Sequence, residues 1–301
     1  MNTNNITNDF KSGFVAIIGA PNVGKSTFLN RVLKTKISIT SRKPQTTRNR
    51  ILGILHTSLS QIVFIDTPGI HEAKSVLNER IVDTAISAIA DVDIILLMTD
   101  VSESGLISEN VILKQLENQN KPIVLALNKI DLVKKNSLLG HISTWEKKCA
   151  FNFIIPICAK TGDNVDKLVE NMESLLPQGP PLFPEEDLTD VSERFIVSEM
   201  IREKVFRLTG KEIPYSTAVT IESFTEKKKE KRVVIHATIH VERESQKGII
   251  IGKNGSKLKR IGQDARKEIE ALLNAGVFLK LFVRVQKNWG KDTKALERFG
   301  Y

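Results

Sequence analysis

The chain has 301 residues and a net charge of +9, and its content of 41% hydrophobic and 26% charged residues is ordinary for a protein with a proper apolar core. This length predicts two domains or one large one, and no run approaches the ~18 apolar residues of a membrane span. The polar, Asn-rich residues 1–11 lack the apolar stretch of a secretory signal, and Cys149 and Cys158 suggest neither a disulfide framework nor a metal site, so a reduced cytosol is the simplest setting.

Short apolar runs rich in β-branched residues alternate with helix-compatible segments in residues 1–182. Continuous apolar strands of this kind predict a mostly parallel sheet with helices on both faces, which binds ligands at the carboxyl ends of its strands. The predicted strands cover residues 13–20, 61–65, 93–97, 122–127 and 153–157, and the predicted helices cover residues 26–33, 76–90, 108–119 and 164–176.

The first strand leads into a loop of the form G-x-x-x-x-G-K-[ST], from Gly19 to Gly24, Lys25 and Ser26, directly before a helix. Glycines let backbone N–H groups close around phosphates, and the helix N-terminus adds positive potential. In such a loop Lys25 reaches the β- and γ-phosphates, and the Ser26 hydroxyl faces Mg²⁺. A chance glycine-rich turn is the alternative, and the strand–loop–helix setting argues against it.

The second strand ends at Asp66, which begins the sequence Asp-Thr-Pro-Gly. A carboxylate here can orient Mg²⁺, and the N–H of Gly69 can meet the γ-phosphate and respond to its loss. By itself this sequence could be an ordinary turn, because Pro and Gly are common in turns. Its place after the P-loop strand favours the nucleotide role.

The fourth strand ends at Asn128, which is followed by Lys129, Ile130 and Asp131. The Asp131 carboxylate can accept hydrogen bonds from N1–H and the 2-amino group of guanine. Adenine offers neither donor and would leave a desolvated carboxylate unpaired, which predicts selectivity for guanine over adenine. After the fifth strand come Cys158, Ala159 and Lys160, which we expect to close the base pocket with the N–H of Ala159 near guanine O6.

Residues 176–184 contain four prolines and a glycine, so a helix cannot continue through them. We predict a first domain over residues 1–182, an acidic, Pro-rich hinge over residues 183–191 and a second domain over residues 192–301. The second domain is basic, with 24 Lys and Arg against 14 Asp and Glu in residues 191–301, which is typical of a module that binds a polyanion, although many basic surfaces are only solvated.

The sequence of the second domain predicts the element order helix, strand, strand, helix, helix, strand. Ser192 is positioned to cap a helix with one apolar stripe that ends near Leu208. The following elements are strands at residues 216–224 and 232–243, a short helix at 248–251, a helix at 256–274 and a strand at 277–286. His236 and His240 fall on the solvent-facing side of the second strand's alternation.

Gly252, Lys253, Asn254 and Gly255 form a G-x-x-G sequence between two predicted helices. Two glycines let the backbone approach a sugar-phosphate chain closely, and lysine adds charge. The alternative is that the glycines only join two helices. The residues expected to contact RNA are Gly252, Lys253, Asn254, Gly255, Ile249, Ile250, Lys257, Lys259 and Arg260.

These motifs resemble the G1, G3, G4 and G5 elements of translation-factor-class GTPases, and the basic loop at residues 38–50 resembles the switch I loop of the Era family. The resemblance covers nearly the whole chain, including residues 288–301. It implies an α/β P-loop NTPase domain, with a mixed, mostly parallel sheet, followed by a smaller α+β type II KH domain.

The resemblance also implies site roles. Thr47 matches the switch I threonine that contacts Mg²⁺ and the γ-phosphate, with Thr46 left open, and Asn22 matches an asparagine that helps bind K⁺. Ile70 stands where many GTPases have a water-orienting glutamine, which predicts slow intrinsic hydrolysis. The residues expected at GTP are Gly19, Asn22, Val23, Gly24, Lys25, Ser26, Thr27, Asp66, Gly69, Asn128, Lys129, Asp131, Cys158, Ala159 and Lys160, with catalytic roles for Lys25, Thr47 and Asn22 and Mg²⁺ bound by Ser26, Thr47 and Asp66.

The resemblance implies a GTPase that binds small-subunit (16S) ribosomal RNA near its 3′ end and acts as a GTP-timed switch in 30S subunit assembly and rRNA processing. It further implies a cytoplasmic monomer that binds no DNA and associates peripherally with the inner face of the cell membrane. One alternative is a constitutive RNA-binding module with a purely structural nucleotide site. A tRNA-modification GTPase would lack the G-x-x-G domain, and a double-domain assembly GTPase would need a second P-loop.

Two features stay open at the level of sequence. Residues 226–232 (EKKKEKR) predict the tip of a hairpin that is either solvated or in contact with phosphates. Trp289 either packs in the protein or stacks on a base.

Overall fold

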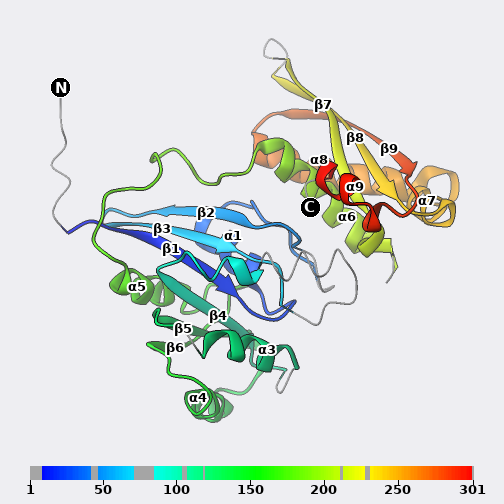
Figure 1. The fold of residues 1–301 in the computed structure, drawn as a ribbon. Coiled ribbons are helices and arrows are strands. Elements are labelled where there is room, and N and C mark those ends of the chain that lie inside the picture. Colours follow the sequence, from blue (N-terminus) through cyan, green and yellow to red (C-terminus); the bar gives the residue numbers. More distant parts are fainter. Residues whose placement is uncertain are drawn as a thin grey trace, which may run out of the picture. The chain divides into compact units, whose positions relative to one another are not determined.

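The computed structural model describes residues 9–41, 47–70, 85–103, 107–117, 119–210, 213–227 and 231–299 (Figure 1). The described residues divide into two compact units. The first contains residues 9–38, 47–70 and the described part of 85–190, and the second contains residues 39–41 and those from 191 onward. None of the helices in these ranges is long and apolar enough to cross a bilayer.

A six-stranded sheet forms the centre of the first unit (Figure 1). The strand order is β2-β3-β1-β4-β5-β6, and β2 alone is antiparallel to its neighbour, which confirms a mixed, mostly parallel sheet. The strands are β1 (Lys11–Ile18), β2 (Ile51–His56), β3 (Ser60–Asp66), β4 (Ile94–Asp100), β5 (Ile123–Asn128) and β6 (Phe153–Pro156).

Helices cover both faces of this sheet. The helix α1 (Lys25–Leu33) packs on one face beside α5 (Val165–Leu175), and Phe28 of α1 meets Phe64 of β3 edge to face at 5.7 Å. The helices α3 (Ile107–Leu116) and α4 (Leu138–Glu146) share a buried core with the other face. Short 3₁₀ turns, η1 (Ile130–Leu132) and η2 (Lys135–Ser137), precede α4. The predicted helix at residues 76–90 lies largely outside the described residues.

β2 and α4 were not predicted from the sequence. Residues 51–56 lack the continuous apolar run of the other strands because Gly53 interrupts them. The glycine is required by packing, since a Cβ there would lie 2.5 Å from the Leu29 side chain of α1. The absence of a side chain at Gly53 thus allows α1 to pack closely against the middle of β2.

The acidic segment predicted as a hinge runs beside β2 in the first unit. The backbone N–H of Ile54 donates to the Leu188 carbonyl (2.9 Å), and the N–H of Leu52 donates to an Asp190 carboxylate oxygen (3.0 Å). The Thr189 hydroxyl donates to the Leu52 carbonyl (2.7 Å). These bonds satisfy backbone groups of an edge strand that would otherwise face solvent.

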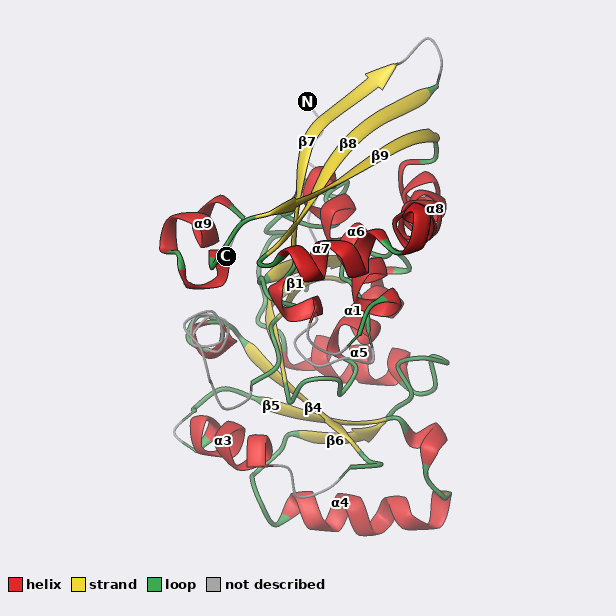
Figure 2. Cartoon of the chain, turned by 90° about the vertical axis from the view of Figure 1, so that its right-hand side faces the viewer, coloured by secondary structure: helices red, strands yellow, loops and turns green. Residues whose placement is uncertain are grey.

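The second unit is a three-stranded sheet with three helices on one face, and α9 lies on the other side (Figure 2). Its order is β7-β8-β9, with β7 antiparallel and β9 parallel to β8. The elements are α6 (Glu193–Leu208), η3 (Ile213–Ser216), β7 (Ala218–Lys227), β8 (Arg232–Val241), α7 (Glu244–Ile251), η5 (Lys253–Gly255), α8 (Ser256–Leu273), β9 (Gly276–Val285), η6 (Trp289–Lys291) and α9 (Thr293–Arg298). The predicted order of helices and strands is confirmed.

The helix α6 begins as expected, because the Ser192 side chain accepts a hydrogen bond from the N–H of Phe195 (3.3 Å). The predicted apolar stripe is buried at Ile196, Val197, Met200, Ile201 and Val205, but the helix buries more than this stripe. Charged side chains are buried as well, and Arg202 binds both carboxylate oxygens of Glu199 at 2.6 and 2.5 Å. Burying a charge in this way requires a paired partner, which Glu199 supplies.

The solvent-facing assignment of His240 was wrong. Its ring is buried because Phe299, at the end of α9, packs against it at a centroid distance of 4.6 Å. Trp289 is fully buried, and its indole N–H donates to the Ser216 carbonyl (3.0 Å). The C-terminal segment therefore closes one end of the sheet, and Trp289 has a packing role.

Candidate functional site

The loop between β1 and α1 has the geometry of a phosphate-binding loop. Gly24 has φ +105°, and a Cβ there would lie 2.2 Å from the Asn128 amide nitrogen, so a side chain is excluded. The Lys25 ammonium turns back into the loop and donates to the carbonyls of Gly19 and Ala20 at 3.0 Å each. Burial lowers the pKa of Lys25 to about 8, and the nearby Asp66 carboxylate opposes this shift.

Three oxygen-bearing side chains converge beside Lys25. The Ser26 hydroxyl lies 2.9 Å from the Thr47 hydroxyl and donates to Asp66 Oδ2 at 2.7 Å. The other carboxylate oxygen of Asp66 is buried and has no hydrogen-bond partner among the described residues. Burial raises the pKa of Asp66, and its hydrogen bonds partly oppose that shift. A buried oxygen of this kind, beside two hydroxyls, fits a hard cation such as Mg²⁺.

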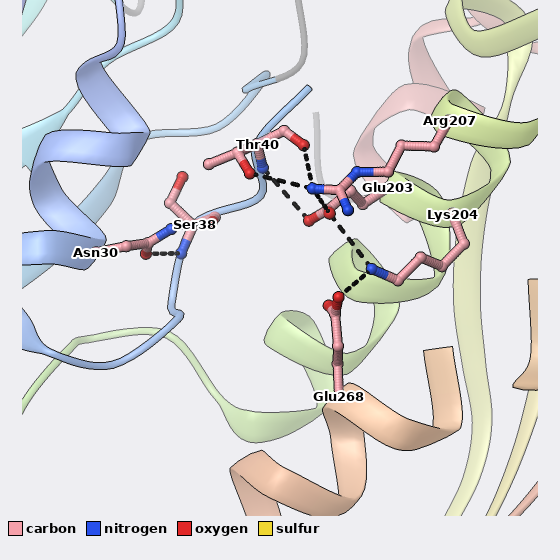
Figure 3. Close-up of polar contacts among 7 residues, drawn as sticks. All are labelled: Asn30, Ser38, Thr40, Glu203, Lys204, Arg207 and Glu268. Carbon is pink, nitrogen blue, oxygen red and sulfur yellow. Dashed lines mark hydrogen bonds and ion pairs between the residues drawn. The ribbon is translucent and has the colours of Figure 1, made fainter. Parts of the chain in front are cut away.

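Ser38 also belongs to this cluster, although it was not among the site residues predicted from the sequence. Its hydroxyl donates to Asp66 Oδ2 at 2.8 Å. Asn30 holds it there, because the Asn30 amide oxygen accepts from the Ser38 N–H (3.0 Å) and the amide nitrogen donates to the Ser38 carbonyl (2.7 Å) (Figure 3). No spacing rule marks this contact, since it depends on how the loop after α1 folds back.

Thr40, two residues further on, is grouped with the second unit. Its N–H donates to a Glu203 carboxylate oxygen of α6 (3.3 Å), and Arg207 donates to the Thr40 carbonyl (3.3 Å) (Figure 3). Glu203 also pairs with Arg207 at 2.5 Å and with Lys204 at 3.4 Å. Thr40 thus lies in a network of charged α6 side chains. Thr46, the alternative to Thr47, falls outside the described residues.

Asn128 links two loops of the expected nucleotide site. Its amide nitrogen donates to the Val23 carbonyl (2.6 Å), and its amide oxygen accepts from the N–H of Ala159 (2.9 Å). Asn128 itself is buried. The N–H of Ala159, expected to meet guanine O6, is therefore engaged by Asn128 in this structure.

Asp131 lies in the turn η1 with its side chain exposed, as a base-binding carboxylate requires. The Cys158 thiol donates to Asp131 Oδ1 at 3.1 Å and helps to orient the carboxylate. Lys129 forms an ion pair with Asp100, at the end of β4. Asp100 in turn accepts from the N–H and hydroxyl of Ser102 at 2.9 and 2.6 Å. Asp100 was not predicted, although its place at the end of a strand is a usable signal.

Two residues tied to hydrolysis have clear positions. Ile70 is fully buried and its N–H donates to the Gly19 carbonyl (3.2 Å), so its side chain cannot orient water. Asn22 is exposed at the P-loop surface with φ +65°. Gly69 lies against the same loop, where a Cβ would be 2.7 Å from Pro21. Val23 is buried beside the loop and Thr27 is half-buried in α1.

The G-x-x-G loop of the second unit joins α7 to α8. Gly252 has φ +72°, and a Cβ there would lie 2.8 Å from the Lys257 side chain. Lys253 and Asn254 are exposed, as are Lys259 and Arg260 on α8.

The neighbouring isoleucines of α7 do not share one role. Ile249 is 44% exposed beside the G-x-x-G loop. Ile250 was expected to contact RNA, but its side chain is fully buried and presents no surface to a ligand. Successive residues of a helix point in different directions, so when Ile249 faces solvent its neighbour Ile250 points into the core.

This fold and these loops define a two-domain protein, with a P-loop nucleotide-binding domain suited to guanine and a G-x-x-G domain. Two family models agree: "50S ribosome-binding GTPase" matches residues 14–129, and "KH domain" matches residues 212–290. "GTPase Era" of Geotalea uraniireducens (strain Rf4) is 56% identical over 97% of this chain and 98% of its own length. "GTPase Era" of Geobacter metallireducens is 55% identical over 98% and 99%.

Two solved Era structures are similar over 97% of this chain and 99% of theirs, at 41% identity. One is Aquifex aeolicus Era bound to GDP and AlF4⁻, with a TM-score of 0.93. The other is Era in complex with MgGDPNP and nucleotides 1506–1542 of 16S ribosomal RNA, with a TM-score of 0.91. The chain belongs to the Era family, and it is a GTPase.

Proposed function

We propose that this chain binds 16S ribosomal RNA near its 3′ end and acts as a GTP-timed switch in 30S subunit assembly and rRNA processing. The observation that carries this proposal is the full-length likeness to Era solved with MgGDPNP and nucleotides 1506–1542 of 16S ribosomal RNA. One family description names the 50S subunit, but that model matches only residues 14–129 and omits the G-x-x-G domain. The 16S complex matches both domains and is the better guide.

We assign the nucleotide contacts as the sequence predicted them. The loop from Gly19 to Thr27 would cradle the phosphates through backbone N–H groups, and Lys25 would leave the two carbonyls it now contacts to meet them. Asp131 would accept from N1–H and the 2-amino group of guanine, supported by its exposure and by the Cys158 contact. Since the N–H of Ala159 is bonded to Asn128, guanine O6 would either share that donor or use the neighbouring Lys160.

Mg²⁺ would be held by Ser26, Thr47 and Asp66. The fit rests on the buried, unpartnered oxygen of Asp66 and on two hydroxyls that lie 2.9 Å apart. When bound, the ion offsets negative charge on the phosphates. The chain's own part is to bring the side chains of Ser26, Thr47 and Asp66 together and to favour the ionised Asp66 carboxylate through hydrogen bonds from Ser26 and Ser38, against the effect of burial.

Hydrolysis would be slow without an activator, because Ile70 cannot orient water. Asn22 is exposed at the phosphate loop, where a monovalent cation can offset developing charge. We therefore propose K⁺ as an activator. K⁺ should accelerate hydrolysis more than Na⁺ does, and Asn22→Ala should remove the difference. Equal rates in the two salts would refute this role.

RNA would be held at the G-x-x-G loop, with Gly252 and Gly255 admitting the backbone, Lys253 and Asn254 contacting phosphates, and the half-exposed Ile249 lying against a base. Lys257, Lys259 and Arg260 add positive charge at the start of α8. Replacing Gly252 by Asp would add a side chain whose Cβ would lie 2.8 Å from the Lys257 side chain. Loss of RNA binding with unchanged GTPase activity is the expected result.

The timing of RNA binding by GTP is supported by the segment at Ser38 and Thr40. Ser38 contacts Asp66 in the expected metal site, and Thr40 contacts Glu203 of α6 two residues later. A change at the γ-phosphate that moves Ser38 would reach Thr40 through one intervening residue.

The test is the affinity of the purified chain for an RNA with the sequence of nucleotides 1506–1542, measured with GDPNP and with GDP. A difference of tenfold or more supports a switch. Equal affinities would favour the alternative, a constitutive RNA-binding module. Crosslinking in cells, followed by sequencing, should recover 16S ribosomal RNA, and recovery of messenger RNA would overturn the substrate assignment.

We also propose that the chain is a cytoplasmic monomer that binds no DNA and associates peripherally with the inner face of the cell membrane. The basic second domain supports attraction to an anionic surface. Sedimentation of cell extracts with and without membranes, at low and high salt, tests the association, and light scattering tests the oligomeric state.

A further inference from the structure

The sheet of the second unit has two faces of different character. The face under α6, α7 and α8 is buried, with Ile235, Ala237, Ile239 and Val241 of β8 fully inaccessible. The opposite face carries the alternate residues, which in β9 read Phe278, Lys280, Phe282 and Arg284, all exposed. We call these four residues the β9 stripe. Among the described residues, Phe299 at the end of α9 packs on this face against His240.

The β9 stripe keeps two large apolar rings in solvent, each 44% exposed. Each ring has a cation beside it: Arg232 lies 5.5 Å from the centre of the Phe278 ring, and Lys280 lies 5.1 Å from that of Phe282. His236 of β8 meets Phe282 edge to face at 6.4 Å. The rings are therefore flanked by polar groups, and they do not form one continuous apolar patch.

Aromatic and cationic side chains alternate along this strand, and that order matches the repeating pattern of one class of ligand. Single-stranded nucleic acid alternates flat bases with phosphates, and proteins hold it with aromatic platforms beside positive charges. Phe278 and Phe282 are four residues apart on a strand, or roughly 13 Å. A lipid surface would instead favour contiguous apolar side chains without interleaved charge.

The charge of this face also suits a polyanion. The described residues that share the face include Lys227, Arg232, Lys280 and Arg284, against the single carboxylate of Glu222. Glu222 lies on β7 and accepts a hydrogen bond from Thr220 (2.8 Å). Its carboxylate also bonds the Thr238 side chain of β8 and interacts electrostatically with Arg284, so it offsets part of the positive charge of the β9 stripe, and the face keeps more cationic than anionic side chains.

The β9 strand is also next to the G-x-x-G loop. It is the edge strand of the sheet, and α7 and α8, the helices on either side of the loop, both pack against it. A KH domain clamps about four nucleotides at its G-x-x-G loop. A longer RNA that leaves this loop and crosses the edge of β9 arrives at the stripe.

We propose that the β9 stripe is a second RNA-binding surface, which stacks bases on Phe278 and Phe282 and binds the intervening phosphates with Lys280 and Arg284. This inference rests on the proposed RNA-binding function and extends it from the G-x-x-G loop to the open face of the sheet. Its ligand is the single-stranded continuation of the RNA held by the loop.

The experiment compares RNA affinity of full-length variants on the 1506–1542 fragment and on versions shortened stepwise from each end. Phe278→Ala and Phe282→Ala should each lower affinity for the full fragment about tenfold, and the double variant about 100-fold. All three should match the wild type on the shortest fragment that still binds. Lys280→Ala should reduce the salt dependence of binding by about one ion.

Further variants separate stacking from apolar contact and from misfolding. Phe282→Trp should keep the wild-type affinity, whereas Phe282→Leu, which keeps apolar bulk without a ring, should lose it. Leu139→Ala, at a residue of α4 that is 74% exposed, is the matched control and should change nothing. Unchanged circular dichroism and melting temperature confirm that each variant is folded.

Two results would overturn the proposal. One is wild-type affinity of the Phe278/Phe282 double variant for the full fragment. The other is a double variant that keeps RNA binding but loses sedimentation with vesicles of phosphatidylglycerol and phosphatidylcholine, which would assign the stripe to a membrane. In either case we still expect Gly252→Asp to abolish RNA binding, which would leave the proposed function intact. The proposed function fails as well if Gly252→Asp binds RNA as tightly as the wild type.

Discussion

The amide nitrogen of Asn128 donates a 2.6 Å hydrogen bond to the backbone carbonyl of Val23, 105 residues earlier in the chain. The loop that should select the base is thereby fastened to the loop that should hold the phosphates. Both partners are buried, so the bond is shielded from competing water.

Asn128→Ala should therefore weaken GTP and GDP alike. It leaves the Val23 carbonyl and the Ala159 N–H without partners, and each buried unsatisfied group costs about 1–3 kcal/mol. We expect an affinity loss of 100-fold or more by fluorescence titration. Asn171→Ala, which removes a half-buried Asn of α5 whose amide nitrogen donates to the Lys167 carbonyl, is the control. A selective loss of GTP with intact GDP binding would contradict a role in joining the loops.

Ser38→Ala should weaken Mg²⁺ binding. It removes one of two hydroxyl donors that orient Asp66 Oδ2, and loss of a group that positions a metal ligand typically lowers metal affinity about tenfold. The Mg²⁺ concentration at half-maximal GTP hydrolysis should rise accordingly, while nucleotide affinity without Mg²⁺ stays constant. Ser174→Ala, at an exposed serine of α5, serves as control. An unchanged Mg²⁺ requirement would show that the hydrogen bond from Ser38 to Asp66 is absent when Mg²⁺ and nucleotide are bound.

Asp131→Asn should exchange base preference. The amide has an NH2 group in place of one of the two acceptor oxygens, so it can no longer accept from both N1–H and the 2-amino group, and GTP affinity should fall about 100-fold or more. Xanthosine triphosphate carries a carbonyl in place of the 2-amino group and should bind better than it does to the wild type. Competition binding with both nucleotides measures the exchange, and Asp163→Asn provides an exposed control. Wild-type GTP binding by Asp131→Asn would sink the base assignment.

His240 should make the second unit sensitive to acid. Burial lowers its pKa to about 4, with Glu222 opposing the shift and Arg298 and Arg284 adding to it. Because the folded pKa lies below the ordinary value of about 6.5, the folded state resists protonation. The free energy of unfolding therefore receives the full contribution of neutral His240 above pH 6.5. As the pH falls towards 4, the free energy of unfolding should decrease by about 1–2 kcal/mol after allowance for solvent screening.

His240→Gln removes that titration, so its melting temperature should fall less than that of the wild type between pH 6.5 and 4. Other titrating groups are the same in both proteins, so their contribution cancels when the two melting temperatures are subtracted at each pH. Melting curves that stay parallel over this range would contradict the assignment.

Much of this protein follows from its sequence alone, because the relevant physics is local. Apolar runs of strand length, a glycine loop before a helix and a serine cap at Ser192 each act within a few residues. They were enough to predict the parallel strands, the P-loop and the order of elements in the second unit. The antiparallel β2 escaped because Gly53 breaks its apolar pattern, and that glycine is explained only by Leu29 of α1 packing against it.

The tertiary structure alone decided which distant groups meet. Ser38 reaches Asp66, Asn128 reaches Val23, and Phe299 covers His240, each across a separation that no local spacing encodes. Burial is likewise a property of the packed chain: Ile249 and Ile250 are adjacent and chemically identical, yet one faces solvent and the other the core. The sequence determines which functional groups each segment carries, and packing determines which of those groups are exposed to a ligand.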